Sequence, residues 1–211
     1  MSIMNQHELL VCGSYYHIFN RGINGCKLFR EPDNYSYFLD LYDKHISPVA
    51  DTYAWVLMPN HFHLLVRIKD AAECGGPQGL KNLEGLEKEP YQYFSNLFNA
   101  YTKAINKCYH RTGSLFEHPF HRKRIASNAF FRNLVVYIHN NPVKHGYKEH
   151  AMDYPWSSYL TCISLSPTKL KRDQVLGWFG NEADFKCLHT QQAGYFGDDE
   201  IFAATKTFKV F

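Results

Sequence analysis

Two histidines, His61 and His63, stand at alternate positions of a short apolar run. On a β-strand, side chains two residues apart project from the same face, so both imidazoles would point one way while Phe62 and Leu64 point to the core. Imidazole binds divalent first-row ions readily, so this pair could form half of a metal site. Two half-exposed histidines without any ligand would give the same pattern, and a metal site therefore needs a third ligand.

A candidate third ligand lies in a segment that is predicted to be helical, where Tyr137 and Asn141 stand four residues apart. This spacing places both side chains on one face of the helix. An amide oxygen is a suitable ligand for Mg²⁺ or Mn²⁺. We therefore expect Tyr137 to lie over a metal bound by Asn141 and the two histidines. The same segment could instead supply only core and capping residues.

The elements that must position these side chains are expected in the order β-α-β-β-α-β-α. They are strands at 15–20, 52–58, 61–68 and 116–125, and helices at 33–46, 90–109 and 128–140. Up to residue 127 this order is the split βαβ, ferredoxin-like arrangement of the α+β class. It predicts a four-stranded antiparallel sheet with helices on one face, and an open second face that carries the chemistry.

The limits of the remaining segments follow from composition. The helix that begins at 128 is expected to end at about Asn140 and to be closed by Asn141-Pro142, because a residue before proline avoids helical geometry. Residues 71–89 are rich in Gly, Glu and Lys, which is typical of a mobile surface loop. We predict a domain at 1–160 and a C-terminal extension at 161–211 with one helix near 171–188.

The charge of the chain is unevenly distributed, although its formal net value is only +3. Residues 99–148 contain nine Lys and Arg and one acid, Glu117, with aromatic residues interleaved. Such a segment suits a nucleic-acid groove, which needs phosphate neutralisation and base stacking, although a solvated charged face fits equally well. The candidates for phosphate contacts are Arg21, Lys103, Arg111, Arg122, Lys123, Arg124 and Lys144.

Other features of the sequence argue against secreted and membrane classes. No stretch approaches the roughly 18–20 apolar residues of a membrane span, and the N-terminus has no basic segment followed by an apolar run. The six cysteines are widely spaced without a CxxC pair, which is typical of reduced thiols. We expect a cytoplasmic protein.

Five short segments occur together in the chain. They read Tyr-His-Ile-Phe-Asn-Arg-Gly at 16–22, Leu-Met-Pro-Asn-His-Phe-His at 57–63, Gly-Ser-Leu-Phe at 113–116, Tyr-Ile-His-Asn-Asn-Pro-Val at 137–143 and Tyr-Pro-Trp-Ser-Ser-Tyr at 154–159. In this order they resemble the REP-associated tyrosine transposases, which are single-tyrosine HUH enzymes of the IS200-like type. The resemblance covers roughly residues 15–160.

The resemblance implies a ferredoxin-like HUH fold, commonly dimeric, that acts on single-stranded DNA near a hairpin. By position, His61 and His63 correspond to the HUH histidines, Tyr137 to the nucleophile and Asn141 to the polar metal ligand of the same helix. The loop at 71–89 and the extended tail after 160 depart from the compact pattern of the family, which leaves the DNA target open.

The implied activity is metal-dependent strand transfer, in which Tyr137 attacks a phosphate and leaves a 5′-phosphotyrosine and a free 3′-hydroxyl. The cofactor would be Mg²⁺ or Mn²⁺. No nucleotide cofactor is expected, since the covalent link retains the energy needed for rejoining. A single nucleophilic tyrosine in each active site favours a homodimer. Two alternatives stay open. A non-catalytic domesticated regulator would not require the four residues together, and a phosphoesterase that uses water would not need Tyr137.

Overall fold

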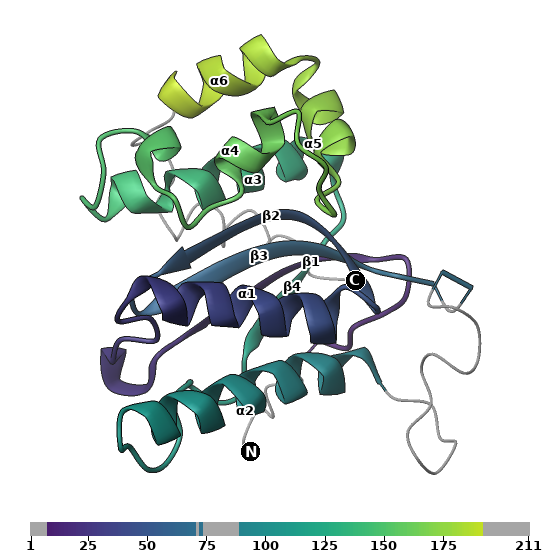
Figure 1. Cartoon of the computed structure of the whole chain (residues 1–211). Coiled ribbons are helices and arrows are strands. Elements are labelled where there is room, and N and C mark those ends of the chain that lie inside the picture. Colours follow the sequence, from purple (N-terminus) through teal and green to yellow (C-terminus); the bar gives the residue numbers. More distant parts are fainter. Residues whose placement is uncertain (1–7, 71, 74–88, 192–211) are drawn as a thin grey trace, which may run out of the picture.

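The computed structural model describes residues 8–70, 72–73 and 89–191. Apart from 72, 73 and 89, the loop predicted at 71–89 lies outside the described residues, as does the tail from 192 onward. Figure 1 shows three layers, with α1 and α2 below the sheet and the remaining helices above it.

The sheet has the predicted ferredoxin-like α+β topology. Its strands are β1 (Tyr15–Arg21), β2 (Ala50–Met58), β3 (His61–Ile68) and β4 (His121–Ile125), all antiparallel and in the order β2-β3-β1-β4. The fourth strand is shorter than the predicted 116–125. Phe116 makes only an isolated bridge to Gly22, and Pro119 has no N–H to donate to a ladder.

Helices α1 (Pro32–Ile46) and α2 (Pro90–Cys108) cover one face of the sheet, close to their predicted bounds. Both begin at a proline, which suits the first helical turn because the N–H it lacks would have no partner there. Phe38 of α1 and Phe94 of α2 are fully buried in one core with Ile18 and Phe62 of the sheet. Phe62 therefore points to this core, as predicted, and its neighbours His61 and His63 point to the other face.

Helix α3 (Asn128–Lys144) continues past the point where it was predicted to end. Pro142 lies inside it, and the N–H of His145 still bonds to the carbonyl of Asn141 at 3.0 Å. Every residue from 134 to 142 is buried. Burial on all sides of the helix thus outweighs the local cost of the proline, which loses one backbone hydrogen bond.

The second face of the sheet is covered rather than open, so that expectation was wrong. Above it lie α3, η2 (Ala151–Asp153), α4 (Tyr159–Ile163), α5 (Arg172–Phe179) and α6 (Glu182–Gln191). Val175 and Phe185 of these helices share a second core with Val56 and Leu65 of the sheet. The single helix predicted near 171–188 is two helices, because Gly180 at φ 93° turns the chain between α5 and α6.

The turn before His61 is fixed by the loop that follows β1, which contains η1 (Ile23–Gly25). The N–H of Gly22 donates to the carbonyl of Asn60 at 2.8 Å. A Cβ at Gly22 would lie 2.0 Å from the carbonyl oxygen of Cys26, so only glycine fits this position. The hydrogen bond between Gly22 and Asn60 holds the β2–β3 hairpin against the end of β1.

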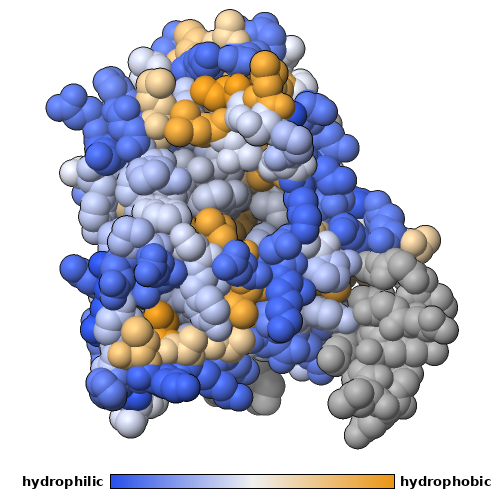
Figure 2. Space-filling view, in the orientation of Figure 1, coloured by the Kyte–Doolittle hydropathy of each residue, from blue (hydrophilic) through white to orange (hydrophobic). Residues whose placement is uncertain are grey.

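The visible face in Figure 2 is mostly hydrophilic, and its apolar atoms form separate groups, the largest over the C-terminal helices. Among the described helices, none is long and apolar enough to cross a membrane. The cysteines in the described part of the chain are all free thiols.

Candidate active site

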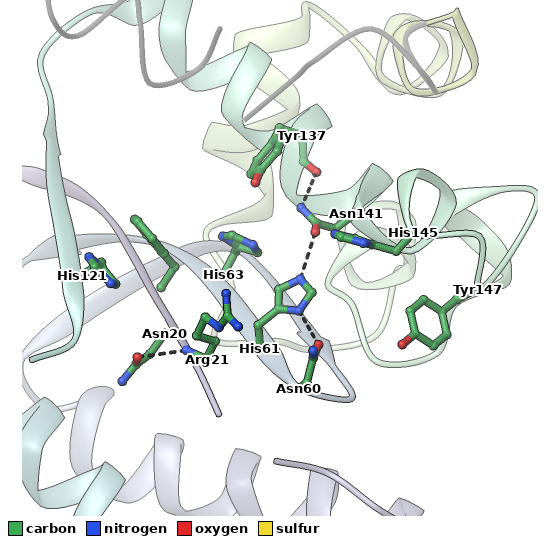
Figure 3. A pocket seen from close by; sticks show the side chains of 11 residues that line it. Asn20, Arg21, Asn60, His61, His63, His121, Tyr137, Asn141, His145 and Tyr147 are labelled. Carbon is green, nitrogen blue, oxygen red and sulfur yellow. Dashed lines mark hydrogen bonds between the residues drawn. The ribbon is translucent and has the colours of Figure 1, made fainter. Parts of the chain in front are cut away.

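The four predicted site residues line one cavity of about 430 Å³ between the sheet and α3. His61 and His63 come from β3, whereas Tyr137 and Asn141 come from α3 with the expected spacing of four residues. Figure 3 shows these side chains converging from above and below the cavity. The cavity is lined by Phe19, Asn20, Arg21, Asn60, His61, His63, His121, Tyr137, Asn141, His145 and Tyr147.

His61 lies between two amide oxygens. Its Nδ1 is 2.7 Å from Oδ1 of Asn60, and its Nε2 is 3.2 Å from Oδ1 of Asn141. The other end of the Asn141 amide donates to the carbonyl of Tyr137 at 3.3 Å, which aims Oδ1 at the histidine. When Nδ1 donates its proton to Asn60, the lone pair of Nε2 faces the lone pair of Asn141. A cation between the two atoms would relieve that opposition.

His63 forms a hydrogen bond with His17, a histidine that was not among the predicted site residues. Its Nδ1 is 3.0 Å from Nε2 of His17, and both rings are buried. Burial lowers the pKa of His63 well below its usual value, and the neighbouring His17 and His61 lower it further. A neutral imidazole that donates from Nδ1 to His17 keeps its lone pair on Nε2, which is the form that binds a metal.

Tyr137 packs edge-on against the histidines, with its ring centroid 5.3 Å from that of His63 and 6.1 Å from that of His17. The ring reaches from α3 toward His63 in Figure 3. Nζ of Lys144 lies 5.6 Å from its centroid. Tyr137 is only 4% exposed, so the phenol is buried at the wall of the cavity rather than presented on an open surface.

The donor set fits a small divalent ion, although it contains only two histidines and an amide. Among residues 8–70, 72–73 and 89–191, no group of three or more His, Cys, Asp and Glu is arranged to hold a metal. Nε2 of His61 and Oδ1 of Asn141 are 3.2 Å apart, which allows both to lie about 2.1 Å from one ion. The hydrogen bonds that the two rings donate to Asn60 and His17 orient them, as outer-shell partners of metal sites do.

The predicted phosphate contacts do not all gather at this cavity. Arg21 lines it and pairs with Glu117 at 3.0 Å, and Lys144 adjoins Tyr137. The register of β4 places Lys123 opposite His17, whereas Arg122 and Arg124 lie opposite Ile18 and Tyr16 and so project from the other face. Lys103 and Arg111 belong to α2 and the turn after it, in the layer below the sheet.

Sequence reasoning missed His17, Phe19, His121, His145 and Tyr147. Alternation along β1 puts His17 and Phe19 on one face with Arg21, but the pairing of that face with β3 needs the sheet register, which the pattern does not supply. His145 stands four residues after Asn141 and its ring centroid is 5.1 Å from that of His61. Because the helix was predicted to end at about Asn140, the sequence did not place His145 on the same helical face as Asn141.

Comparison with known proteins finds the same family that the motifs indicated. No protein-family model matches the chain. A curated protein of Haemophilus influenzae (strain ATCC 51907 / DSM 11121 / KW20 / Rd), which carries the name REP-associated tyrosine transposase, is 26% identical over 109 residues. The match covers 52% of this chain and 58% of the relative. The resemblance to this family is confirmed.

The fold comparison agrees with the sequence comparison. The solved structure of a REP-associated tyrosine transposase bound to a REP hairpin has a TM-score of 0.61 and 19% identity to this chain. The match covers 79% of this chain and 89% of that one. This chain and that transposase therefore share a fold.

The motifs that resemble those of the transposases build the cavity together. The segment at 16–22 supplies Phe19 and Arg21, the segment at 57–63 supplies the histidines, and the segment at 137–143 supplies the helix face above them. The two remaining motifs, at 113–116 and 154–159, do not line the cavity but bond to the strands and loops that position it. The carbonyl of Leu115 accepts from the loop after β1, and Oγ of Ser158 accepts from the N–H of Trp55 on β2.

Proposed function

We propose that the chain is a metal-dependent transposase that cleaves and rejoins single-stranded DNA through a covalent link to Tyr137. The observation that supports it most is the convergence of Tyr137 and Asn141 on His61 and His63 across one cavity. These residues come from two segments about 75 positions apart in the chain. A protein that only binds DNA has no use for that combination.

The chemistry divides between the phenol and the ligand set. A divalent Mg²⁺ or Mn²⁺ ion, held by His61, His63 and Asn141, would polarise the scissile phosphate and offset charge on its oxygens. The oxygen of Tyr137 attacks phosphorus and the bond to the 3′-oxygen breaks. The phenol gives up its proton and the departing oxygen takes one up as a 3′-hydroxyl. Attack by another 3′-hydroxyl on the 5′-phosphotyrosine reverses these changes, so rejoining requires no ATP.

The proposed substrate is single-stranded DNA beside a hairpin. The solved transposase of the same fold is bound to a REP hairpin, and the cavity wall of this chain carries Arg21 and Lys144 for phosphate contacts. Because Tyr137 is the single proposed nucleophile of each chain, two cleavages require two chains, and we propose a homodimer as the working unit. Sedimentation of the protein with hairpin DNA tests this assembly.

The decisive experiment is capture of a covalent adduct. Wild type and Tyr137→Phe are incubated with end-labelled hairpin DNA and Mn²⁺, denatured, and examined for labelled protein. Wild type should capture DNA, whereas the variant keeps the ring, loses the attacking oxygen and should capture none. Tyr147→Phe, which alters another tyrosine of the same cavity, is the matched control. Capture by Tyr137→Phe would place the nucleophile elsewhere, and no capture by wild type with any metal would leave DNA binding alone.

The ligand set is tested by calorimetry with Mn²⁺. His61→Ala and His63→Ala should each abolish measurable binding, while Asn141→Ala should weaken it less, because water can replace a neutral amide oxygen. His63 is buried, so circular dichroism must show that each variant is folded. His110→Ala, a histidine beyond the end of α2, is the control. Equal affinity in wild type and the double histidine variant would remove the metal site from the proposal.

The salt dependence of binding tests which cations contact the backbone. Replacing Arg21, Lys123 and Lys144 together by Ala should lower the magnitude of the log–log salt slope for single-stranded DNA by roughly 2. Replacing Lys103 and Arg111, which lie in the layer below the sheet, should leave the slope unchanged. The opposite result would place the DNA on the α2 side of the molecule.

A further inference from the structure

Four rings from three adjacent strands lie next to one another at one side of the cavity, with the planes of neighbouring rings 10° to 30° apart. His63 of β3 is stacked with Phe19 of β1 at a centroid distance of 5.7 Å and an interplanar angle of 27°. Phe19 is in turn stacked with His121 of β4 at 4.9 Å and 10°. His17 lies beside both His63 and Phe19, at 22° and 30°. The stack therefore runs from the buried candidate ligand to the edge of the sheet.

The outer end of this stack is accessible. His121 is exposed and is the first residue of β4, one of the two edge strands of the sheet, and both His121 and Phe19 line the cavity. In Figure 3, His121 and Tyr147 lie at opposite sides of the cavity, with the candidate metal ligands between them. A ring seated on His121 would thus lie beside the reacting phosphate rather than on a remote surface.

The surroundings of the stack favour a nucleotide as its occupant. Lys123 follows two residues after His121 and projects from the same face, and Arg21 lies on that face beside Phe19. These cations can meet phosphates while the rings meet a base. Stacking of a base on an aromatic ring is tolerant of sequence, because every base has a π-face. A base inside a duplex already has its faces covered by its neighbours, so the platform would select an unpaired one.

We propose that His121, backed by Phe19, forms a stacking platform for one unpaired nucleobase that adjoins the scissile phosphate. The inference deepens the proposed function and rests on it, since it assumes single-stranded DNA in this cavity. The parallel planes are already in place before the base arrives, so little ordering is required on binding. The platform would fix the base, and through it the position of the phosphate relative to Tyr137.

The test uses a series of hairpin oligonucleotides in which each unpaired position in turn carries 2-aminopurine, whose fluorescence is quenched by stacking. Binding is measured in EDTA, so the outcome does not depend on cleavage. Wild type should quench one position strongly. His121→Ala should lose that quenching and bind about 5- to 150-fold more weakly, whereas His121→Phe should retain both. Tyr91→Ala, an exposed aromatic of α2, is the matched control.

An abasic site at the quenched position supplies the second arm. It should weaken wild type and have little further effect on His121→Ala, because the two changes remove the same contact. Quenching that is unaltered in His121→Ala would show that the stack is internal packing only. Loss that His121→Phe does not restore would mean that a ring nitrogen, not the ring face, contacts DNA. Quenching without a covalent adduct would uphold the platform while the proposed cleavage fails.

Discussion

Two pairs of buried histidines in this protein have almost the same geometry. His17 and His63 are joined by a ring-nitrogen hydrogen bond of 3.0 Å, with centroids 5.1 Å apart and planes at 22°. His139 and His189 are joined at 3.0 Å, with centroids 5.1 Å apart and planes at 29°. Seen in isolation, neither pair reveals what it does.

The pairs differ in what their remaining nitrogens meet. In the pair of α3 and α6, Nε2 of His139 is 2.7 Å from Oγ of Ser158, and Nδ1 of His189 is 2.7 Å from the carbonyl of Phe185. All four ring nitrogens therefore have partners within the protein. In the pair of β1 and β3, His63 instead lines the cavity.

The comparison shows that a buried imidazole pair is defined by the ends of its hydrogen-bond chain. Where both ends of the hydrogen-bond chain meet protein groups, as for the closed pair His139 and His189, the bonds fix the helices that carry the rings, since every donor and acceptor is satisfied. Where the hydrogen-bond chain ends at the cavity, as for the open pair His17 and His63, the bond holds one ring in a single tautomer and leaves its other nitrogen facing a ligand. We expect the closed pair to control stability and the open pair to control metal affinity.

The largest expected effect is on the closed pair. His139→Ala should lower the free energy of unfolding by about 3 to 5 kcal/mol, because it removes a fully buried ring, leaves Nε2 of His189 without its partner and costs Ser158 one of its hydrogen bonds. Urea unfolding measures this change. The folded fraction should bind Mn²⁺ as wild type does. A loss below about 1 kcal/mol would mean that water replaces the ring and that the pair is not a clamp.

The open pair should respond in the opposite sense. His17→Ala should reduce Mn²⁺ affinity by about 10- to 100-fold, because His63 loses the group that sets its tautomer and orientation. Its stability should fall by only about 1 to 2 kcal/mol, since water from the cavity can bond to His63. Calorimetry and urea unfolding on the same preparation separate the two effects. Should Mn²⁺ affinity be retained while stability collapses, the two pairs would have the same role.

The pH dependence of stability sharpens the contrast, since burial lowers the pKa of His189 to about 4. The unfolded chain takes up this proton near pH 6.5, whereas the folded chain excludes it until about pH 4. Stability should therefore be complete above pH 6.5 and fall between pH 6.5 and 4 by up to about 1.4 kcal/mol per pH unit for this residue. His189→Gln, which does not titrate, should show a shallower slope in urea unfolding at several pH values. Parallel slopes would assign the pH dependence to other groups.

The smallest expected effect on stability is that of Ser158, whose hydroxyl ends the hydrogen-bond chain of the closed pair. Ser158→Ala removes the hydroxyl that bonds to His139 and accepts from the N–H of Trp55. The loss in unfolding free energy should be about 1 to 2 kcal/mol, because the ring stays packed and only hydrogen bonds are lost. Thermal unfolding of this variant beside Ser166→Ala, an exposed serine, measures it. A change equal to that of His139→Ala would show that the hydroxyl, not the ring, holds the helices together.

The open pair and the cavity were partly predictable from the sequence. Alternation along 61–68 placed His61 and His63 on one face, and helical spacing placed Tyr137 and Asn141 together, since both patterns depend on local geometry alone. The pairing of His17 with His63 depends on the register of β1 against β3, which local patterns do not determine. That is why the partner of a predicted ligand was missed.

The closed pair was not predictable. His189 lies 50 residues from His139, and the predicted single helix near 171–188 stopped short of it. The ferredoxin-like arrangement was also expected to leave the second face of the sheet open, whereas α3 and the helices after it cover that face. The nine consecutive buried residues of α3, 134–142, are a tertiary property that the 3.6-residue pattern does not report. The same burial explains why Pro142 did not end the helix.

Helix α3 bears both arrangements on opposite sides of its axis. Tyr137 and His139 are two residues apart and thus about 200° apart around the helix. A DNA strand that is too large to enter the cavity could reach the phenol only if α3 rotated about its axis. Such a rotation would turn His139 away from His189 by the same angle. The hydrogen bond between His139 and His189 therefore ties the angular position of the phenol to α6, and we expect a contact that displaces α6 to shift Tyr137 as well.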